Sequence, residues 1–282
     1  MAETREKARG LMPLSESRYS NIIRALMAPL IRFIVNVIAE LGQALSFLKD
    51  IGRYVFTGRI RFGEVLKQLY EQGVQSVVII ALTSLATGAV LAIQGAVTLS
   101  RFGAREFIAQ LVAWSLVREM SPVFTAIIFS AKAGARITAE LGTMNVNDQM
   151  LATRTMGVDP VEFLVVPRML ACILVMPILT VVSEVVGIAG GYLFSIIEAN
   201  IPGAYYMNQT FKAIRFVDFF SGFSKVFFFA VLVSWICCYQ GYITKGGSLG
   251  VGKYTTKAVA YSIIFVILSN TVLTKLIVLL WK

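Results

Sequence analysis

The sequence contains no histidine, only three cysteines and few charged residues. Histidine is the commonest general base and metal ligand at neutral pH, so its absence argues against an enzyme that works by acid–base or zinc chemistry. Cys172, Cys237 and Cys238 all lie in hydrophobic segments, and their spacing forms neither a disulfide framework nor a zinc site. We therefore expect buried thiols and no bound metal.

Charged residues make up 15% of the chain, well below the roughly one quarter typical of soluble domains. Hydrophobic residues reach 57% and the mean hydropathy is +0.74, which indicates an integral membrane protein. The net charge of +10 comes from basic residues that flank hydrophobic runs. This pattern favours anionic lipid headgroups over nucleic acid as the counterpart.

Three runs contain no charged residue at all: 72–100, 226–244 and 258–274. A membrane-spanning helix needs about 20 apolar residues. The sequence predicts an all-α integral membrane protein with five transmembrane helices, at 74–99, 108–134, 163–196, 220–243 and 257–280.

The N-terminal quarter is more polar. Residues 1–20 form a polar tail that lacks the apolar core of a secretory signal. Charges interrupt residues 21–72 so often that we expect interfacial amphipathic helices there, although a tilted span through 26–48 is an open alternative. Residues 73–282 are predicted to form the five-span domain.

The distribution of Lys and Arg predicts the orientation. A cytoplasmic N-terminus places most of the 26 basic residues on the cytoplasmic side and leaves the C-terminus on the other. The third span contains Pro177 and the small-residue pair Gly187 and Gly191, which predict a kink and a close helix contact. Residues 198–218 are expected to form a short external segment at the interface.

A polar, small-residue stretch, 131–160, separates the second and third spans. We expect a short helix within it, with Asn147 as N-cap, Gly157 in the left-handed position that ends it, and Asp159–Pro160 blocking its continuation. Val146, Met150, Leu151 and Met156 give it an apolar side. So short a helix is marginal alone, which predicts that its own domain or a partner protein holds it.

Charges inside the predicted spans are the remaining signal. Arg118 and Glu119 are adjacent in the second span, so they point about 100° apart and cannot simply neutralise each other. Lys225 in the fourth span is the best partner for Glu119. These residues form either a structural ion pair or a water-accessible cavity that meets an ionic headgroup. Glu184 in the third span is solitary.

One glycine-rich segment imitates a nucleotide site. Residues 247–254 are one residue short of a P-loop, because Tyr254 stands where a Ser or Thr would bind magnesium. The segment also follows a membrane helix rather than a strand. We interpret it as a glycine-rich cytoplasmic turn.

Several ordered motifs resemble the MlaE/YrbE permease family, the membrane subunits of MCE-associated ABC phospholipid transporters, over about residues 60–280. They are Gln68-Leu-Tyr70 with Gly73, Gln94-Gly95, Ser115-Leu-Val-Arg-Glu119 with Pro122, Ala133-Gly134, Thr138-Ala-Glu-Leu-Gly142, Asp148-Gln149, Met156-Gly-Val-Asp-Pro160 and Pro167-Arg168. One position departs from the pattern: Lys132 stands where the family often has Arg.

The resemblance implies a homodimer in the bacterial inner membrane, with the N-terminus in the cytoplasm and the C-terminus in the periplasm. Separate ABC ATPase subunits would bind ATP and Mg, an MCE-domain ring would cover the outer side, and this chain would bind no cofactor itself. Segment 140–160 would be the cytoplasmic coupling helix.

The resemblance also implies site residues. Those for the phospholipid are Leu91, Leu99 and Phe102 at the acyl chains, with Arg118, Glu119 and Lys225 near the polar part. Those for coupling to the ATPase are Glu140, Asp148, Gln149, Arg154, Met156, Gly157, Asp159 and Pro160.

The predicted function is therefore a non-enzymatic permease that moves phospholipids between membranes. Two alternatives come from other classes. The first is an ion-coupled secondary transporter that uses Glu119 and Glu184, although five spans show no convincing inverted repeat. The second is a lipid-modifying enzyme, which lacks a plausible acid–base pair.

Overall fold

The computed structural model describes residues 39–57 and 61–280, and every regular element in these ranges is a helix. Residues 1–49 and 50–282 belong to two separate compact units. Residues 39–57 are helical. The predicted polar tail and the first part of the predicted interfacial segment lie outside the described residues, as does the core of the alternative span at 26–48.

Five helices of the described residues are long and apolar enough to cross a membrane, which confirms the predicted multi-pass fold: Phe62–Arg101, Arg105–Val146, Val161–Ala199, Phe216–Tyr242 and Gly247–Leu280. The first three each contain several consecutive elements. The first span consists of α3 Phe62–Leu69, η1 Tyr70–Val74 and α4 Gln75–Arg101. The second consists of η2 Arg105–Phe107, α5 Ile108–Ser115, η3 Leu116–Met120, α6 Ser121–Phe129, η4 Ser130–Gly134 and α7 Ala135–Val146. The third consists of η5 Val161–Val165 and α9 Val166–Ala199. The last two are α11 Phe216–Tyr242 and α12 Gly247–Leu280.

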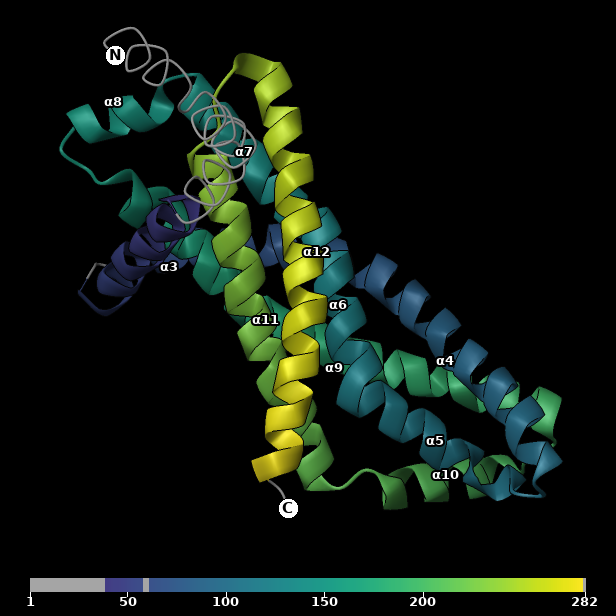
Figure 1. Cartoon of the computed structure of the whole chain (residues 1–282). Helices are drawn as coiled ribbons and strands as arrows, with labels where there is room; N and C mark the ends of the chain where they lie inside the picture. The colour runs from purple at the N-terminus through teal and green to yellow at the C-terminus, as the bar shows by residue number, and fades with distance from the viewer. Residues whose placement is uncertain (1–38, 58–60, 281–282) are drawn as a thin grey trace, which may run out of the picture. The chain divides into compact units, whose positions relative to one another are not determined.

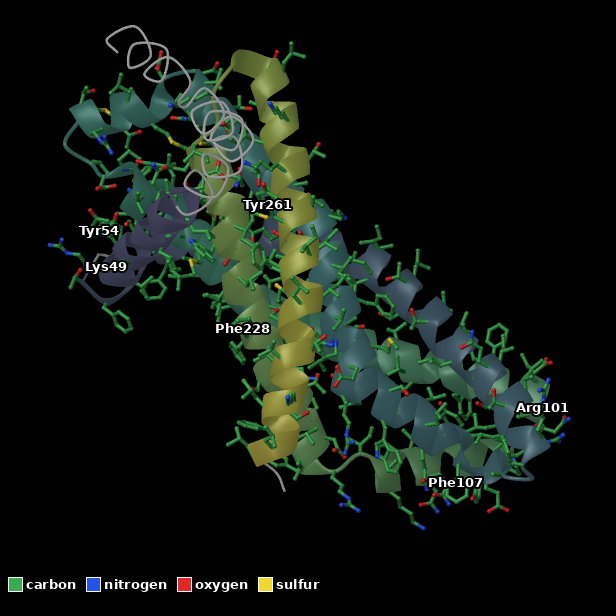
Figure 2. The ribbon with its side chains drawn as sticks, in the orientation of Figure 1. Lys49, Tyr54, Arg101, Phe107, Phe228 and Tyr261 are labelled. Carbon is green, nitrogen blue, oxygen red and sulfur yellow. The ribbon has the colours of Figure 1, made fainter. Side chains whose placement is uncertain are left out.

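Two short helices mark the ends of the bundle (Figure 1). At one end, α8 Gln149–Thr155 follows α7; at the other, α10 Gly203–Ala213 packs against α5 and α9. We call these the α8 end and the α10 end. Figure 2 shows Arg101 and Phe107 at the α10 end, far from Tyr54.

Helices α4 and α9 approach so closely that their backbones are almost in contact. A Cβ atom added to Gly88 would lie 1.8 Å from the carbonyl oxygen of Gly187, and one added to Gly190 would lie 2.3 Å from that of Leu85. Ser84 and Ser183 share a hydrogen bond of 2.7 Å across the same interface. The close contact predicted for the third span is confirmed, because small residues let membrane helices approach.

The helix that contains the second predicted span continues beyond Gly134, through α7 to Val146. In this extension Arg136 pairs with Glu71, and Lys132 just before it donates to the carbonyl of Gln75. The end of the predicted interfacial segment, from Phe62 onward, is continuous with the helix of the first span.

The predicted external segment, 198–218, contains a helix. In α10, Tyr206, Thr210 and Ala213 are buried, and Tyr206 belongs to an apolar cluster with Ile108, Val112 and Leu116. The buried residues recur at helical spacing, so α10 packs one side against α5.

Candidate functional site

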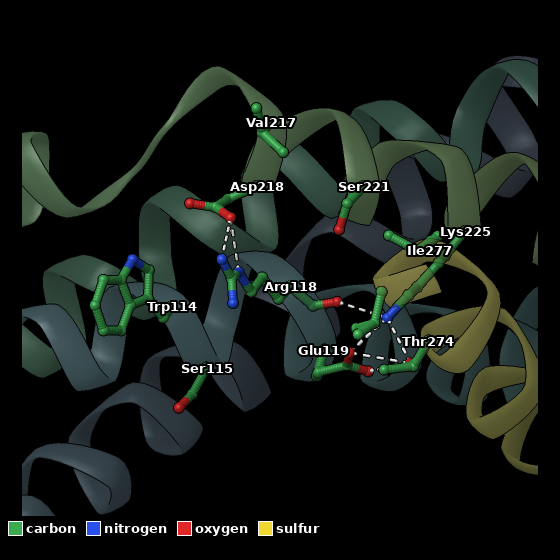
Figure 3. A pocket seen from close by; sticks show the side chains of 11 residues that line it. Trp114, Ser115, Arg118, Glu119, Val217, Asp218, Ser221, Lys225, Thr274 and Ile277 are labelled. Atoms are coloured by element: carbon green, nitrogen blue, oxygen red, sulfur yellow. Dashed lines mark hydrogen bonds and ion pairs between the residues drawn. The ribbon is translucent and has the colours of Figure 1, made fainter. Parts of the chain in front are cut away.

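A pocket of about 460 Å³ opens between the second span, α11 and α12 (Figure 3). Its lining combines apolar side chains with charged ones: Trp114, Ser115, Arg118, Glu119, Val217, Asp218, Ser221, Lys225, Thr274, Ile277 and Val278. Lys225 lies early in α11 and Thr274 late in α12, so the pocket is nearer the α10 end. Charged groups at such a depth are expected to face a cavity or a partner, and here they do both.

A local break in the second span presents Arg118 and Glu119 to this pocket. Both residues lie in the π-helical turn η3, which ends two residues before Pro122. Proline has no N–H, so it cannot donate to the carbonyl of Arg118 four residues earlier, and π turns commonly form where the α-helical ladder is interrupted. The ammonium of Lys225 donates to that carbonyl oxygen at 3.1 Å.

Lys225 is fully enclosed, with 1% of its side chain exposed. Besides the Arg118 carbonyl, its ammonium donates to Glu119 Oε1 at 2.6 Å and to Thr274 Oγ1 at 2.8 Å. The predicted pairing of Lys225 with Glu119 is confirmed. Since an ammonium has one donor for each of these acceptors, Lys225 has no donor left for a ligand.

Glu119 has further partners on the last span, and no sequence pattern identifies them. Asn270 Nδ2 donates to Glu119 Oε2 at 3.0 Å, and the Thr274 hydroxyl lies 3.1 Å from Oε1. These contacts join η3, α11 and α12. About one third of the Glu119 side chain is exposed, 34%, so its carboxylate still reaches the pocket.

Arg118 forms a different ion pair, with Asp218 at the start of α11. Nε donates to Asp218 Oδ1 at 2.8 Å, and Nη2 donates to the same oxygen. Asp218 Oδ2 accepts the backbone N–H of Arg215 at 3.3 Å, so the carboxylate also caps α11. Asp218 is 4% exposed, whereas half of the Arg118 side chain, 50%, is exposed, and Arg118 lines the pocket.

Trp114 closes one side of the pocket. Its Nε1 donates to the carbonyl oxygen of Ala213 at 2.8 Å, which fixes the end of α10 against α5. The guanidinium carbon of Arg118 lies 5.9 Å from the indole ring centre, within the range of a cation–π contact.

The predicted acyl-chain residues lie elsewhere. Leu91 and Leu99 pack against the apolar cluster around Tyr206, and Phe102 is exposed just beyond the end of α4. None of them lines the pocket, so the structure of one chain does not bring them together with Arg118 and Glu119. Glu184 is buried in α9 and does not line the pocket either.

A second polar network lies toward the α8 end and joins three spans. Arg136 on α7 donates to Glu140 at 2.7 Å and pairs with Glu71 in η1 at 3.1 Å. Arg168 on α9 pairs with Glu140 at 3.3 Å, and Lys132 donates to the carbonyl of Gln75. Glu140 thus pairs with two arginines and links α7 to α9 at the start of the predicted coupling segment.

The coupling segment has the predicted short helix but a different start. Asn147 ends α7, and Asp148 is the N-cap residue of α8, in the left-handed region at φ 57°. Gly157 follows α8 at φ +79°, as predicted, because this conformation favours glycine. Of the residues expected to form an apolar docking side, Met150 is buried, whereas Leu151 and Met156 are exposed.

Asp159 fixes the end of this segment. Its Oδ1 accepts the backbone N–H of Val161 at 2.8 Å, and its Oδ2 accepts the hydroxyl of Tyr54 at 2.7 Å. The hydrogen bond to the carboxylate, with partial burial, raises the pKa of Tyr54 above its usual value. Asp148, Gln149, Arg154 and Met156 stay exposed around α8, and Pro160 is buried.

A family model described as permease MlaE matches residues 65–276 of this chain, across the pocket and the coupling segment. The chain belongs to the MlaE permease family. The MlaE match extends from α3 to within a turn of the end of α12 and so contains all five spans.

Curated relatives agree with the MlaE assignment. A probable ABC transporter permease of Rickettsia typhi is 39% identical over 86% of this chain and 98% of the relative. The intermembrane phospholipid transport system permease protein MlaE of Haemophilus influenzae is 35% identical over 86% of this chain and 97% of the relative. The chloroplastic protein TRIGALACTOSYLDIACYLGLYCEROL 1 of Arabidopsis thaliana is 34% identical over 78% of this chain and 63% of the relative.

Proposed function

We propose that this chain is the membrane-spanning subunit of an ABC transporter that moves phospholipids between membranes. The observation that carries this proposal is the pocket beside Arg118, in which an exposed guanidinium meets apolar walls inside the bundle. A guanidinium binds phosphate through paired N–H groups, and apolar walls suit acyl chains. The printed names of the relatives, ABC transporter permease and phospholipid transport permease, support the same class.

Hydrolysis of ATP takes place in a separate ATPase partner, which holds ATP and Mg. The P-loop-like residues 247–254 support this division, because from Gly247 onward they form the first turns of α12, and no strand precedes them in the described ranges. In the part of the chain that the structure describes, no group of three His, Cys, Asp or Glu side chains could hold a metal ion. The chain acts as a transport subunit rather than an enzyme.

The ATPase binds the coupling segment, 140–160. Exposed Leu151 on α8 and Met156 directly after it support this proposal, since they give a partner an apolar surface that the described residues leave open. An MCE-domain ring lies at the α10 end, and a second copy completes a homodimer. The chain lies in a bacterial inner membrane, with the α8 end in the cytoplasm and the C-terminus in the periplasm.

The ion-coupled alternative is not favoured by the geometry. Glu119 is neutralised by Lys225 at 2.6 Å and accepts a further hydrogen bond from Asn270. Glu184 lies outside the pocket. The two carboxylates therefore do not form one ion site.

Arg118→Ala is expected to lower ATP-dependent phospholipid transport at least about tenfold, because, among the described residues that line the pocket, the one charged donor not enclosed is lost. The complex should still assemble, because Asp218, which loses its cation, still accepts the backbone N–H of Arg215 at 3.3 Å. Transfer of labelled phospholipid between vesicles measures the effect. Arg101→Ala, at the exposed end of α4, is the matched control. Wild-type transport by the Arg118 variant would remove this residue from the site.

Gly157→Val is expected to uncouple ATP hydrolysis from transport several-fold. A β-branched residue is strained at φ +79°, and the turn after α8 would shift. Gly157→Asn is the matched control, because asparagine tolerates this conformation and no atom lies within 4 Å of the added Cβ. The lipid moved per ATP hydrolysed is the quantity to measure. Equal coupling in the two variants would contradict the role given to this turn.

A further inference from the structure

The charges that line the pocket balance. Two cations, Arg118 and Lys225, face two carboxylates, Glu119 and Asp218, and each cation is paired with one carboxylate. Arg215 and Lys275 are exposed and do not line the pocket, and solvent screens such charges over about 10 Å. The site that receives a headgroup therefore has no net charge.

The two ion pairs leave different groups open to a ligand. Lys225 has used its donors and is enclosed. On the Arg118 guanidinium, the N–H groups of Nε and Nη2 that meet Asp218 point away from the rest of the fork, and the side chain is half exposed. Figure 3 shows Arg118 between Asp218 and the cluster around Glu119. The pocket thus offers one cationic donor and, close by, a partly exposed carboxylate on Glu119.

We propose that this pocket selects zwitterionic over anionic phospholipid headgroups, and that Asp218 is the residue that sets this preference. This inference rests on the proposed function. The phosphate accepts from the free N–H groups of Arg118, and the headgroup ammonium lies toward Glu119. A headgroup without net charge matches a pocket without net charge, whereas an anionic headgroup brings a negative charge that no lining residue offsets.

Asp218 acts through Arg118 and is a positioning residue. It orients the guanidinium through two N–H groups and cancels its charge. Without this carboxylate, Arg118 would present an uncompensated positive charge, and the pocket would favour anionic lipid. Asn in place of Asp218 keeps an oxygen that can accept the backbone N–H of Arg215, so the cap on α11 is preserved.

The test uses the complete transporter, purified with its partners and equilibrated with mixed micelles of equal phosphatidylethanolamine and phosphatidylglycerol. Mass spectrometry measures the ratio of the two lipids bound. The wild type should retain an excess of phosphatidylethanolamine, and Asp218→Asn should shift the ratio about fivefold toward phosphatidylglycerol, the effect expected from one partly screened charge. An unchanged ratio in a folded variant would overturn the proposal.

A second pair of variants tests the same idea without touching the cap. Ser221 lines the pocket and makes no charged contact there. Ser221→Lys should shift the ratio toward phosphatidylglycerol and Ser221→Asp toward phosphatidylethanolamine, and added bulk alone cannot produce opposite shifts. Identical ratios in both would contradict the charge-balance argument even if Asp218→Asn does not fold. Failure of the wild type to retain any phospholipid would instead refute the proposed function.

Discussion

Gly88→Ala is expected to prevent stable folding of the chain. The added Cβ would lie 1.8 Å from the carbonyl oxygen of Gly187, which belongs to the backbone of α9 and cannot move aside like a side chain. Helices α4 and α9 would have to separate, and this separation would break the hydrogen bond between Ser84 and Ser183. We expect a loss of about 3 kcal/mol or more, the upper range for overpacking. Thermal unfolding in detergent, followed by size-exclusion chromatography, measures it.

Gly95→Ala on the same helix is the matched control. A Cβ at Gly95 would meet Leu111 at 3.4 Å and Ile108 at 3.6 Å, which are ordinary contacts. The same substitution seven residues apart should therefore be severe at one position and tolerated at the other. Equal stability of the two variants would show that α4 and α9 do not approach as closely as described.

Lys225→Met is expected to lower the free energy of unfolding by about 1–3 kcal/mol, because it leaves a buried carbonyl without its donor and a partly exposed carboxylate without its cation. Glu119 would lose its 2.6 Å contact, and the carbonyl of Arg118 would lose the donor that Pro122 cannot supply. Unfolding by denaturant in detergent, monitored by fluorescence, gives the difference from the wild type.

The double variant Lys225→Met with Glu119→Gln distinguishes the energy of the ion pair from the separate contributions of the two residues. With both charges removed, no buried charge is left unpaired, so the double variant should be more stable than Lys225→Met alone. Glutamine can still accept from Asn270 and Thr274, which lie 3.0 Å and 3.1 Å from the carboxylate of Glu119. Additive losses would mean that Lys225 and Glu119 act independently.

The sequence predicted the five spans and one ion pair because both leave local signals. Apolar runs long enough to span a bilayer are visible directly, and a lone lysine in an apolar helix needs a carboxylate. Lys225 and Glu119 could be matched because few charges compete for them inside the spans. The left-handed turn at Gly157 was predictable for a similar reason, since a glycine directly before Val158, Asp159 and Pro160 is typical of a helix end.

The remaining partners depend on tertiary packing. Asp218 was assigned to an external segment, and nothing in its neighbourhood shows that it meets Arg118, which lies 100 positions earlier in the chain. Asn270 and Thr274 are ordinary polar residues in an apolar span until α12 packs against α11 and η3. The π turn at η3 could not be predicted from the sequence either. Pro122 indicates that a backbone hydrogen bond of the helix is missing, but not that a π turn forms there.

Helices extend beyond the predicted spans where polar residues have partners in the protein. Lys132, Gly134 and Arg136 are typical of a helix that reaches water, yet here the cations meet Gln75, Glu71 and Glu140, and α7 continues to Val146. At the other end of the bundle, α10 is a helix because Tyr206 and Thr210 fit against α5 and α9. Neither result follows from local pattern.

ATP-dependent transfer of labelled phospholipid in reconstituted vesicles tests the central claim most directly. The complete complex of this chain with its ATPase is compared with the same complex without ATP and with the chain alone. Transfer that requires both ATP and the ATPase, and that falls at least about tenfold with Arg118→Ala, is the predicted result. Transfer by the chain alone, without nucleotide, would contradict the account.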